Sequence, residues 1–247
     1  MQSILAIETS QASCAVAIRT SDGIQQLSCI AERKHGSVLL PMVAELLDQH
    51  GVHPSELDSI AFGCGPGSFT GARIAASVAQ GLAFGSDASV VPVSSLRALS
   101  HTAAMQFDLS KDAAVFVAVN AHMDEIYCAC YRNDSGMSAI QADALLGKQD
   151  AGSQLMSVYT QFSQLVLVGN GVSLLELPGV STNTTDLLDS LMAQVEGLSA
   201  DCIDLQPSAA SILQFAEQAI ENGDQIAPEQ AVPAYLRGRS AWKKMKE

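Results

Sequence analysis

The first part of the chain carries short apolar segments separated by polar turns, a pattern typical of β-strands. It predicts strands over residues 3–8, 13–19 and 25–32, joined by Thr9-Ser10-Gln11 and by the turn Ser21-Asp22-Gly23. Strands that follow one another this closely pair as an antiparallel meander.

A helical pattern follows the meander. Leu39, Val43, Leu46 and Leu47 fall on one helix face, so we predict a helix over residues 38–49 with Ser37 as its N-cap. Strands and helices then alternate, with a strand at 58–63, a helix at about 68–84, a strand at 89–93 and a helix ending near 106. This alternation after a meander predicts an α/β fold with a mixed sheet.

The polar stretch 108–112 marks a predicted boundary, after which strands again precede helices. We predict strands at 113–120, 125–131, 138–146 and 164–168, and helices at 184–195 and 207–222. In both halves of the chain, strands come first and helices follow. This common order suggests a duplicated fold, although no motif recurs at a fixed spacing. The predicted units are residues 1–108 with about 206–232, a smaller second half at 109–205, and a basic C-terminal tail at 233–247.

Composition indicates a globular protein, because 48% of the residues are apolar and 16% are charged. The net charge of −13 argues against a general nucleic-acid binder. The last eleven positions nevertheless carry +4, which leaves −17 on residues 1–236. The basic residues there, Arg237, Arg239, Lys243, Lys244 and Lys246, belong either to a frayed end or to a segment, anchored by Trp242, that docks on tRNA or a partner.

The cysteine pattern favours reduced thiols in a cytoplasmic protein, because the six cysteines contain no C-x-x-C pair. The N-terminus lacks the basic flank of a signal peptide, and no apolar run is long enough to cross a membrane. Cys128 and Cys130 would share one strand face, and His50 and His53 form H-x-x-H, but neither pair has the further ligands that a metal site needs. We therefore predict no metal site.

A glycine-rich segment from Gly63 to Arg73 stands between a predicted strand and a predicted helix. It matches neither the P-loop nor the dinucleotide fingerprint, and it lacks a nucleophile elbow. Two interpretations stay open here. The backbone N–H groups at the helix start could hold an anion, or the glycines could simply permit a tight turn and close helix packing.

The helix that follows is poor in bulky side chains. Gly71, Ala75 and Ala79 recur at a spacing of four residues and form a stripe of small side chains. The stripe either packs on the helix's own sheet or admits a second helix, which we prefer and which could come from another subunit. No pattern of nucleophile, base and acid can be nominated from spacing alone.

Several blocks of the sequence resemble the TsaB (YeaZ) family of bacterial tRNA threonylcarbamoyladenosine biosynthesis proteins. They run through the chain in the family's order: Leu5-Ala6-Ile7-Glu8-Thr9-Ser10, His35 with Leu40-Pro41-Met42-Val43, Gly65-Pro66-Gly67-Ser68-Phe69-Thr70-Gly71-Ala72-Arg73-Ile74, Ala79-Gln80-Gly81-Leu82-Ala83, Pro92-Val93-Ser94-Ser95-Leu96, Met123 with Glu125-Ile126-Tyr127, Pro233-Ala234-Tyr235-Leu236-Arg237 and Ala241-Trp242-Lys243-Lys244. The blocks extend from residue 3 to residue 244, so the resemblance covers nearly the whole chain.

The resemblance implies an actin/Hsp70-like (ASKHA) fold of two ribonuclease-H-like halves. It implies a non-catalytic partner of TsaD, the subunit that transfers threonylcarbamoyl to the adenosine beside the anticodon of tRNA. The implied partners are TsaD, TsaE and a second copy of the chain, with tRNA bound only through the complex. The expected partner-binding residues on the helix faces and the glycine-rich turn are Leu39, Val43, Gly65, Gly67, Ser68, Phe69, Thr70, Gly71, Arg73, Ala75 and Ala79.

The sequence departs from its catalytic relatives where they bind metal and nucleotide. The histidines that hold metal in TsaD correspond to Ser95 and Leu99, and the turn Glu8-Thr9-Ser10-Gln11 lacks the glycine of nucleotide-binding members. We expect no cofactor of its own, with ATP or ADP at most at an interface within the complex.

Four positions also differ from the residues expected within the family, namely Cys64, Asn120, His122 and Asp124. The alternatives to a scaffold are a nucleotide-binding sensor and a glycoprotease-like hydrolase, and no combination of residues here supports the hydrolase.

Overall fold

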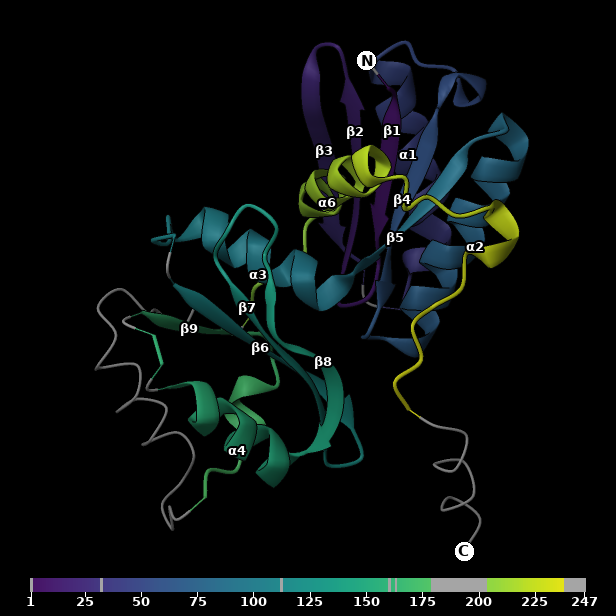
Figure 1. Cartoon of the computed structure of the whole chain (residues 1–247). Helices are drawn as coiled ribbons and strands as arrows, with labels where there is room; N and C mark the ends of the chain where they lie inside the picture. Colours follow the sequence, from purple (N-terminus) through teal and green to yellow (C-terminus); the bar gives the residue numbers. More distant parts are fainter. Residues whose placement is uncertain are drawn as a thin grey trace, which may run out of the picture.

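The computed structural model describes residues 2–31, 33–111, 113–159, 161–162, 164–178 and 204–237. It contains two β-sheets with two helices between them and further helices on their outer faces (Figure 1).

The first sheet has five strands in the order β3-β2-β1-β4-β5. Its strands are β1 (Ile4–Glu8), β2 (Ser13–Thr20), β3 (Gly23–Ile30), β4 (Ser59–Gly65) and β5 (Ser89–Ser94). The pairs β1/β2 and β2/β3 are antiparallel, whereas β4 is parallel to both β1 and β5. The predicted meander and the mixed sheet are therefore both present.

The second sheet repeats this arrangement in the order β8-β7-β6-β9. Its strands are β6 (Ala114–His122), β7 (Glu125–Arg132), β8 (Ala139–Gly147) and β9 (Leu165–Val168). An antiparallel meander is again followed by a parallel strand, here β9 beside β6. The common strand order supports the duplication suggested by the sequence, while the exact domain boundaries stay a prediction.

The helices form three groups. Helices α1 (His35–Gln49) and α2 (Phe69–Ser86) pack with one face of the first sheet in a single apolar cluster, and α4 (Lys148–Tyr159) packs on the second sheet. Helices α3 (Ser95–Gln106) and α6 (Ala209–Asn222) lie between the sheets (Figure 1). Short 3-10 helices occur at Pro54–Glu56, Val172–Leu174 and Pro228–Gln230.

The largest apolar cluster joins the two sheets through α3 and α6. Val93 from the first sheet, Val117 from the second, Leu99 on α3 and Phe215 on α6 all belong to it, and each is at most 4% exposed. Burial of apolar surface is the main favourable contribution to folding, so the two sheets are stabilised together.

Most predicted elements are confirmed, with differences at three helices. Helix α1 begins at His35 rather than Val38, because Ser37 does not cap it but donates from Oγ to the Lys34 carbonyl at 2.9 Å. Helix α6 begins at Ala209 rather than Pro207, with Ser208 accepting from the Ser211 backbone N–H as its N-cap. Helix α4 was not predicted, and the helix predicted at 184–195 lies outside the described residues.

The interface between α3 and α6 contains a histidine that should make stability depend on pH. His101 Nδ1 lies 2.9 Å from Ser211 Oγ, and its ring meets Phe215 edge-on. Burial and the nearby Arg97 charge lower the pKa of His101. The folded state therefore holds the neutral ring, and the unfolded state takes up a proton first as the pH falls below about 6.5.

We expect the free energy of unfolding to fall between about pH 7.5 and about pH 5.5, since the unfolded chain binds more protons in this window. His101→Gln, which keeps a polar partner for Ser211, should show a smaller loss. Urea denaturation of both chains at the two pH values measures the difference. Equal losses in the two chains would show that His101 does not contribute.

Candidate functional site

The glycine-rich turn links the end of β4 to the start of α2. Ser68 is the N-cap of α2, and its Oγ accepts from the Gly71 backbone N–H at 3.2 Å. Gly65 has a φ of +94°, which favours glycine over residues with a side chain. The turn thus brings the N-terminus of α2 close to the first sheet.

The backbone of the β1–β2 turn fills the space beside these glycines. The Ser68 N–H donates to the Ser10 carbonyl at 2.7 Å, and Thr9 Oγ1 donates to the Gly71 carbonyl at 2.8 Å. A Cβ on Gly67 would lie 2.4 Å from the Ser10 carbonyl oxygen, and one on Gly71 would lie 1.9 Å from that of Thr9. This geometry favours the packing interpretation of the glycine-rich turn over the anion-binding one.

A buried carboxyl group lies behind the turn. Glu8 is fully buried, and its Oε1 accepts from the Ser10 N–H at 2.5 Å while its Oε2 accepts from Ser95 Oγ at 2.8 Å. Ser95 Oγ in turn accepts from the Gly65 N–H at 3.2 Å. Burial raises the pKa of Glu8, and the hydrogen bonds offset part of that effect. These bonds connect β1, β4 and α3 at one point.

Ser95 and Leu99, which the resemblance sets opposite metal-binding histidines, take part in internal contacts. Ser95 is bonded as described, and Leu99 is fully buried in the cluster shared by the two sheets. Across the part of the chain that the structure describes, no group of three or more His, Cys, Asp or Glu side chains could hold a metal ion.

The two pairs considered for metal binding have other partners. His53 caps the 3-10 helix at Pro54–Glu56, with Nδ1 accepting from the Ser55 N–H at 3.3 Å. Cys128 and Cys130 are buried, and burial raises the pKa of each thiol to about 12. Both thiols lie in the apolar cluster between the second sheet and α4, and no third His, Cys, Asp or Glu joins them among the described residues.

An exposed stack of two aromatic rings and an arginine stands at the start of α2. The guanidinium carbon of Arg73 lies 3.6 Å from the Phe69 ring centroid, and its Nε donates to Tyr235 Oη at 2.9 Å. The Phe69 and Tyr235 rings are 6.1 Å apart and are 48% and 55% exposed. We call Phe69, Arg73 and Tyr235 the aromatic–arginine stack.

The predicted partner-binding residues fall into two sets. Ser68, Phe69, Thr70 and Arg73 are exposed. The other set faces the interior or is partly covered, and it contains Leu39, Val43, Gly65, Gly67, Gly71, Ala75 and Ala79.

Ala75 and Ala79 are fully buried in the cluster that α2 shares with the first sheet and with α1 of the same chain. The expectation that these two side chains bind a partner directly is corrected, because they do not reach the surface. Small residues let α2 lie close to β4, and an arginine at either position would bury a charge in the core.

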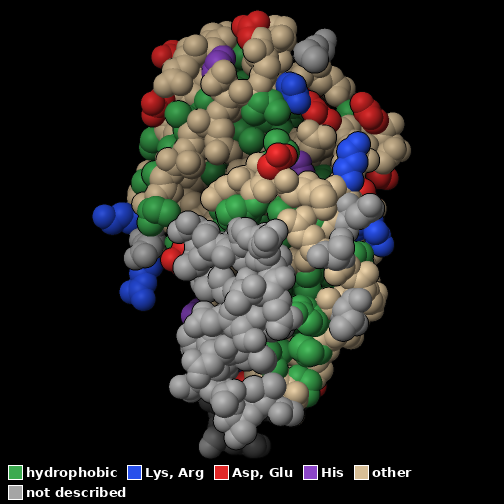
Figure 2. Space-filling model, turned by 90° about the vertical axis from the view of Figure 1, so that its left-hand side faces the viewer, with side chains coloured by type: hydrophobic (Ala, Val, Ile, Leu, Met, Phe, Trp, Pro, Cys, Tyr) green, Lys and Arg blue, Asp and Glu red, His purple; other side chains and the backbone are tan. Residues whose placement is uncertain are grey.

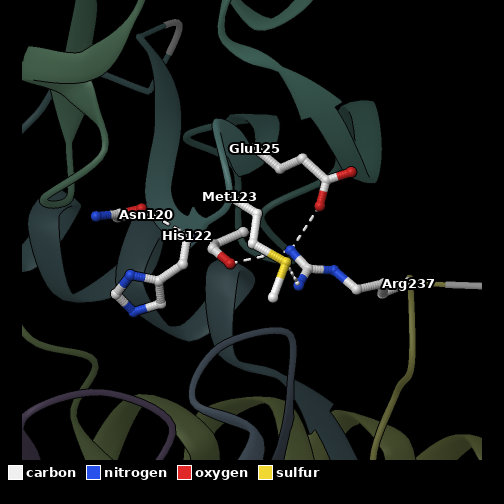
Figure 3. A network of polar contacts seen from close by, with 6 residues as sticks. Asn120, His122, Met123, Glu125 and Arg237 are labelled. Atoms are coloured by element: carbon white, nitrogen blue, oxygen red, sulfur yellow. Dashed lines mark hydrogen bonds and ion pairs between the residues drawn. The ribbon is translucent and has the colours of Figure 1, made fainter. Parts of the chain in front are cut away.

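The C-terminal segment 231–237 runs from the first sheet to the second. The Ala234 N–H donates to the Cys64 carbonyl at 2.8 Å, and Tyr235 joins the aromatic–arginine stack. Arg237 then reaches the β6–β7 turn, as Figure 3 shows. We call this segment the C-terminal strap.

The guanidinium group of Arg237 makes three contacts at the β6–β7 turn. Its Nη2 lies 2.5 Å from Glu125 Oε2 and 3.0 Å from the Ala121 carbonyl oxygen, and its Nη1 lies 3.3 Å from Met123 Sδ (Figure 3). These internal contacts occupy the side chain that we expected to dock on tRNA or a partner. Arg239, Trp242, Lys243 and Lys244 lie outside the described residues.

The turn that Arg237 contacts has an uncommon backbone. His122, Met123 and Asp124 have φ values of +60°, +55° and +60°, in the left-handed region that favours glycine. Each such residue costs on the order of 1 kcal/mol and persists where its surroundings hold it in place. Asn120 Oδ1 accepts from the His122 N–H at 2.8 Å, and Lys148 Nζ lies 2.7 Å from Asp124 Oδ1.

A further polar link joins the two sheets at the end of β5. Ser94 Oγ donates to Asp143 Oδ2 on β8 at 2.6 Å, and Tyr131 Oη on β7 donates to Oδ1 of the same carboxylate. Burial and the Asp143 charge raise the pKa of Tyr131, so its hydroxyl remains a donor. The two sheets are therefore connected by this link, by the C-terminal strap and by the shared core.

Surface charge gives no sign of a nucleic-acid interface on the side drawn in Figure 2. Lysine and arginine side chains on this face are few and dispersed among the described residues. This distribution agrees with the net charge of −13. No helix within the described ranges is long and apolar enough to cross a membrane.

Comparison with known proteins decides the family. A family model described as "TsaD: tRNA N6-adenosine threonylcarbamoyltransferase" matches residues 28–245. The tRNA threonylcarbamoyladenosine biosynthesis protein TsaB of Escherichia coli is 30% identical over 244 residues, covering 98% of this chain and 97% of that protein. The protein of the same name from Haemophilus influenzae is 29% identical over 262 residues, covering 98% and 96%. The chain belongs to the TsaB (YeaZ) family.

Structural comparison supports the same conclusion. The structure of YeaZ from Pseudomonas aeruginosa matches with a TM-score of 0.75 at 32% identity, covering 96% of this chain and 100% of that one. The predicted TsaB resemblance is confirmed, and so is the α/β fold with mixed sheets. Within the TsaB fold, the sequence did not reveal the Arg237–Glu125 contact, because the two residues lie far apart in the chain.

Two glycines of α2 provide a matched test of the close approach at the glycine-rich turn. Gly71→Ala should lower the free energy of unfolding by about 1 to 3 kcal/mol, because the new Cβ would overlap the Thr9 carbonyl. Gly81→Ala meets no atom within 4 Å and should be neutral or stabilising by up to about 1 kcal/mol. Urea denaturation measures both, and equal effects would contradict the packing interpretation.

A double-mutant cycle tests the contact between the strap and the β6–β7 turn. Arg237→Ala and Glu125→Ala should show a coupling of roughly 1 kcal/mol, since both side chains are partly shielded from water. The more exposed pair Lys148 and Asp124 is the control, and its coupling should be smaller because water screens it. Chemical denaturation gives both values, and a coupling near zero for Arg237 and Glu125 would mean that the strap is not held there.

Proposed function

We propose that this chain acts in tRNA threonylcarbamoyladenosine biosynthesis as a non-catalytic partner that binds and activates TsaD. TsaD, as the family match describes it, is a tRNA N6-adenosine threonylcarbamoyltransferase. In this proposal the chain contributes a surface that supports the transferase, and no side chain of its own takes part in the transfer.

The observation that carries the proposal is that Ser95 and Leu99, which the resemblance sets opposite metal-binding residues of TsaD, make internal contacts here. Ser95 is hydrogen-bonded to the buried Glu8, and Leu99 belongs to the shared core. A hydroxyl group already bonded on both sides and a buried alkyl group are poor ligands for a metal ion. The turn that holds phosphate in nucleotide-binding members is here packed against the glycines that follow β4.

The exposed side of α2 is the surface that we assign to the partner. Phe69 and Arg73 point outward at the start of this helix, where Tyr235 holds the arginine in place. Aromatic and arginine side chains are enriched at protein interfaces and often dominate binding energy. Thr70 and Ser68 lie beside them and add polar contacts at the edge.

The remaining expectations belong to the same proposal. The chain pairs with a second copy of itself in the absence of TsaD, and TsaE joins the complex. ATP or ADP binds only at an interface between subunits, and tRNA binds only through the complex. All of these steps take place in the cytoplasm.

The first experiment is light scattering after size exclusion, with the chain alone and mixed with TsaD from the same organism. We expect a homodimer that exchanges into a heterodimer. The same mixture, supplied with TsaE, ATP, tRNA and threonylcarbamoyl adenylate as the donor, should form threonylcarbamoyladenosine, and omission of this chain should abolish the product. If the chain forms no complex with TsaD in this measurement, the proposal is overturned.

Variants in the aromatic–arginine stack test the assigned surface. Phe69→Ala and Arg73→Glu should weaken the heterodimer at least tenfold, as expected for central interface residues. Met105→Ala is the control, because Met105 is 71% exposed at the far end of α3. Far-ultraviolet circular dichroism checks that all three chains fold. Unchanged affinity in both stack variants would place the interface elsewhere.

A further inference from the structure

Two cysteines face each other across neighbouring strands of the first sheet. Cys14 on β2 and Cys29 on β3 are register partners in an antiparallel pair. The Ala31 N–H donates to the Ala12 carbonyl in the same register, so Cys14 and Cys29 are a hydrogen-bonded pair with Cα atoms about 5.5 Å apart, and their side chains lie on the same side of the sheet. A disulfide bond requires Cα atoms within roughly 4.4 to 6.8 Å, so the strand pairing already satisfies this condition.

The two thiols differ in exposure. Cys29 is exposed at the edge strand β3, and its Sγ lies 3.7 Å from Met42 Sδ on α1. Cys14 is fully buried in the cluster that joins α1 to the sheet. Burial raises the pKa of Cys14 to about 12, and negative charge on Cys29 or Glu8 adds to this effect. An outer thiol that an oxidant can reach therefore has an inner thiol beside it.

We propose that Cys14 and Cys29 form a reversible disulfide between β2 and β3 when the chain meets a small disulfide oxidant. The sulfur of Cys29, as thiolate, attacks oxidised glutathione, breaks its S–S bond and releases one glutathione. Cys14 then loses its proton to solvent and attacks the Cys29 sulfur, which releases the second glutathione. The two thiols give up two electrons and two protons, which the two glutathione molecules carry away.

The geometry around the pair explains why the second step follows the first. Besides burial, a negative charge on the Cys29 sulfur raises the pKa of Cys14, and that sulfur carries no charge once it is bonded to glutathione. The strand register holds the two sulfurs as neighbours while this happens. The new bond would draw Cys29 away from Met42, so oxidation changes the contact between the edge strand and α1.

The test is oxidation of the native chain with oxidised glutathione, followed by alkylation of free thiols and non-reducing peptide mapping by mass spectrometry. We expect a peptide pair linked through Cys14 and Cys29, lighter by two hydrogens and separated by dithiothreitol. Cys64→Ser, which changes a thiol outside the pair, should form the same link.

Single variants of the pair separate the two steps. Cys14→Ser should retain glutathione on Cys29 as a stable mixed disulfide, and Cys29→Ser should leave Cys14 unmodified in the folded chain. A native chain that keeps glutathione on Cys29 without forming the link would overturn the proposal. The same holds if the link appears only above the unfolding temperature, because the folded register would then not have brought the thiols together.

Discussion

The buried carboxyl group of Glu8 is the point on which the first sheet and its surroundings depend. It accepts hydrogen bonds from the Ser10 N–H and from the Ser95 hydroxyl, and the oxygen of that hydroxyl accepts one from the Gly65 N–H. A carboxyl group without these donors would be costly to bury, so its burial requires the β1–β2 turn, the end of β4 and the start of α3 to keep these positions. The glycines at 63, 67 and 71 are then needed because no side chain fits between these segments.

This arrangement also determines what lies on the surface. Because the glycine-rich turn is tied to the β1–β2 turn, α2 begins at a fixed place, and the C-terminal strap passes beside it through Ala234 and Tyr235. The strap then continues to Glu125 on the second sheet. A partner that binds the start of α2 would therefore contact a surface built from both ends of the sequence.

Local patterns in the sequence predicted the strands well, since strand identity depends on apolar runs and turn residues that lie close together. Helix α4 was missed although Ala151, Leu155 and Val158 follow a helical spacing, because Gly152 and the polar residues between them weaken the signal. The left-handed turn at His122–Asp124 could not be predicted, since no glycine or Asn-Gly pair marks it. The contact of Arg237 with Glu125 depends on the complete fold.

The stripe of small residues on α2 was expected to admit a second helix, which could come from another subunit. Its spacing indicated close approach, and the structure has this approach within the chain, to the first sheet and to α1. Helices with small contact residues lie nearer to their neighbours, so Ala75 and Ala79 determine how deeply α2 sits. The same helix turns Phe69 and Arg73 outward. The buried stripe therefore contributes to a partner surface indirectly, because it determines how far from the sheet the exposed side chains of α2 lie.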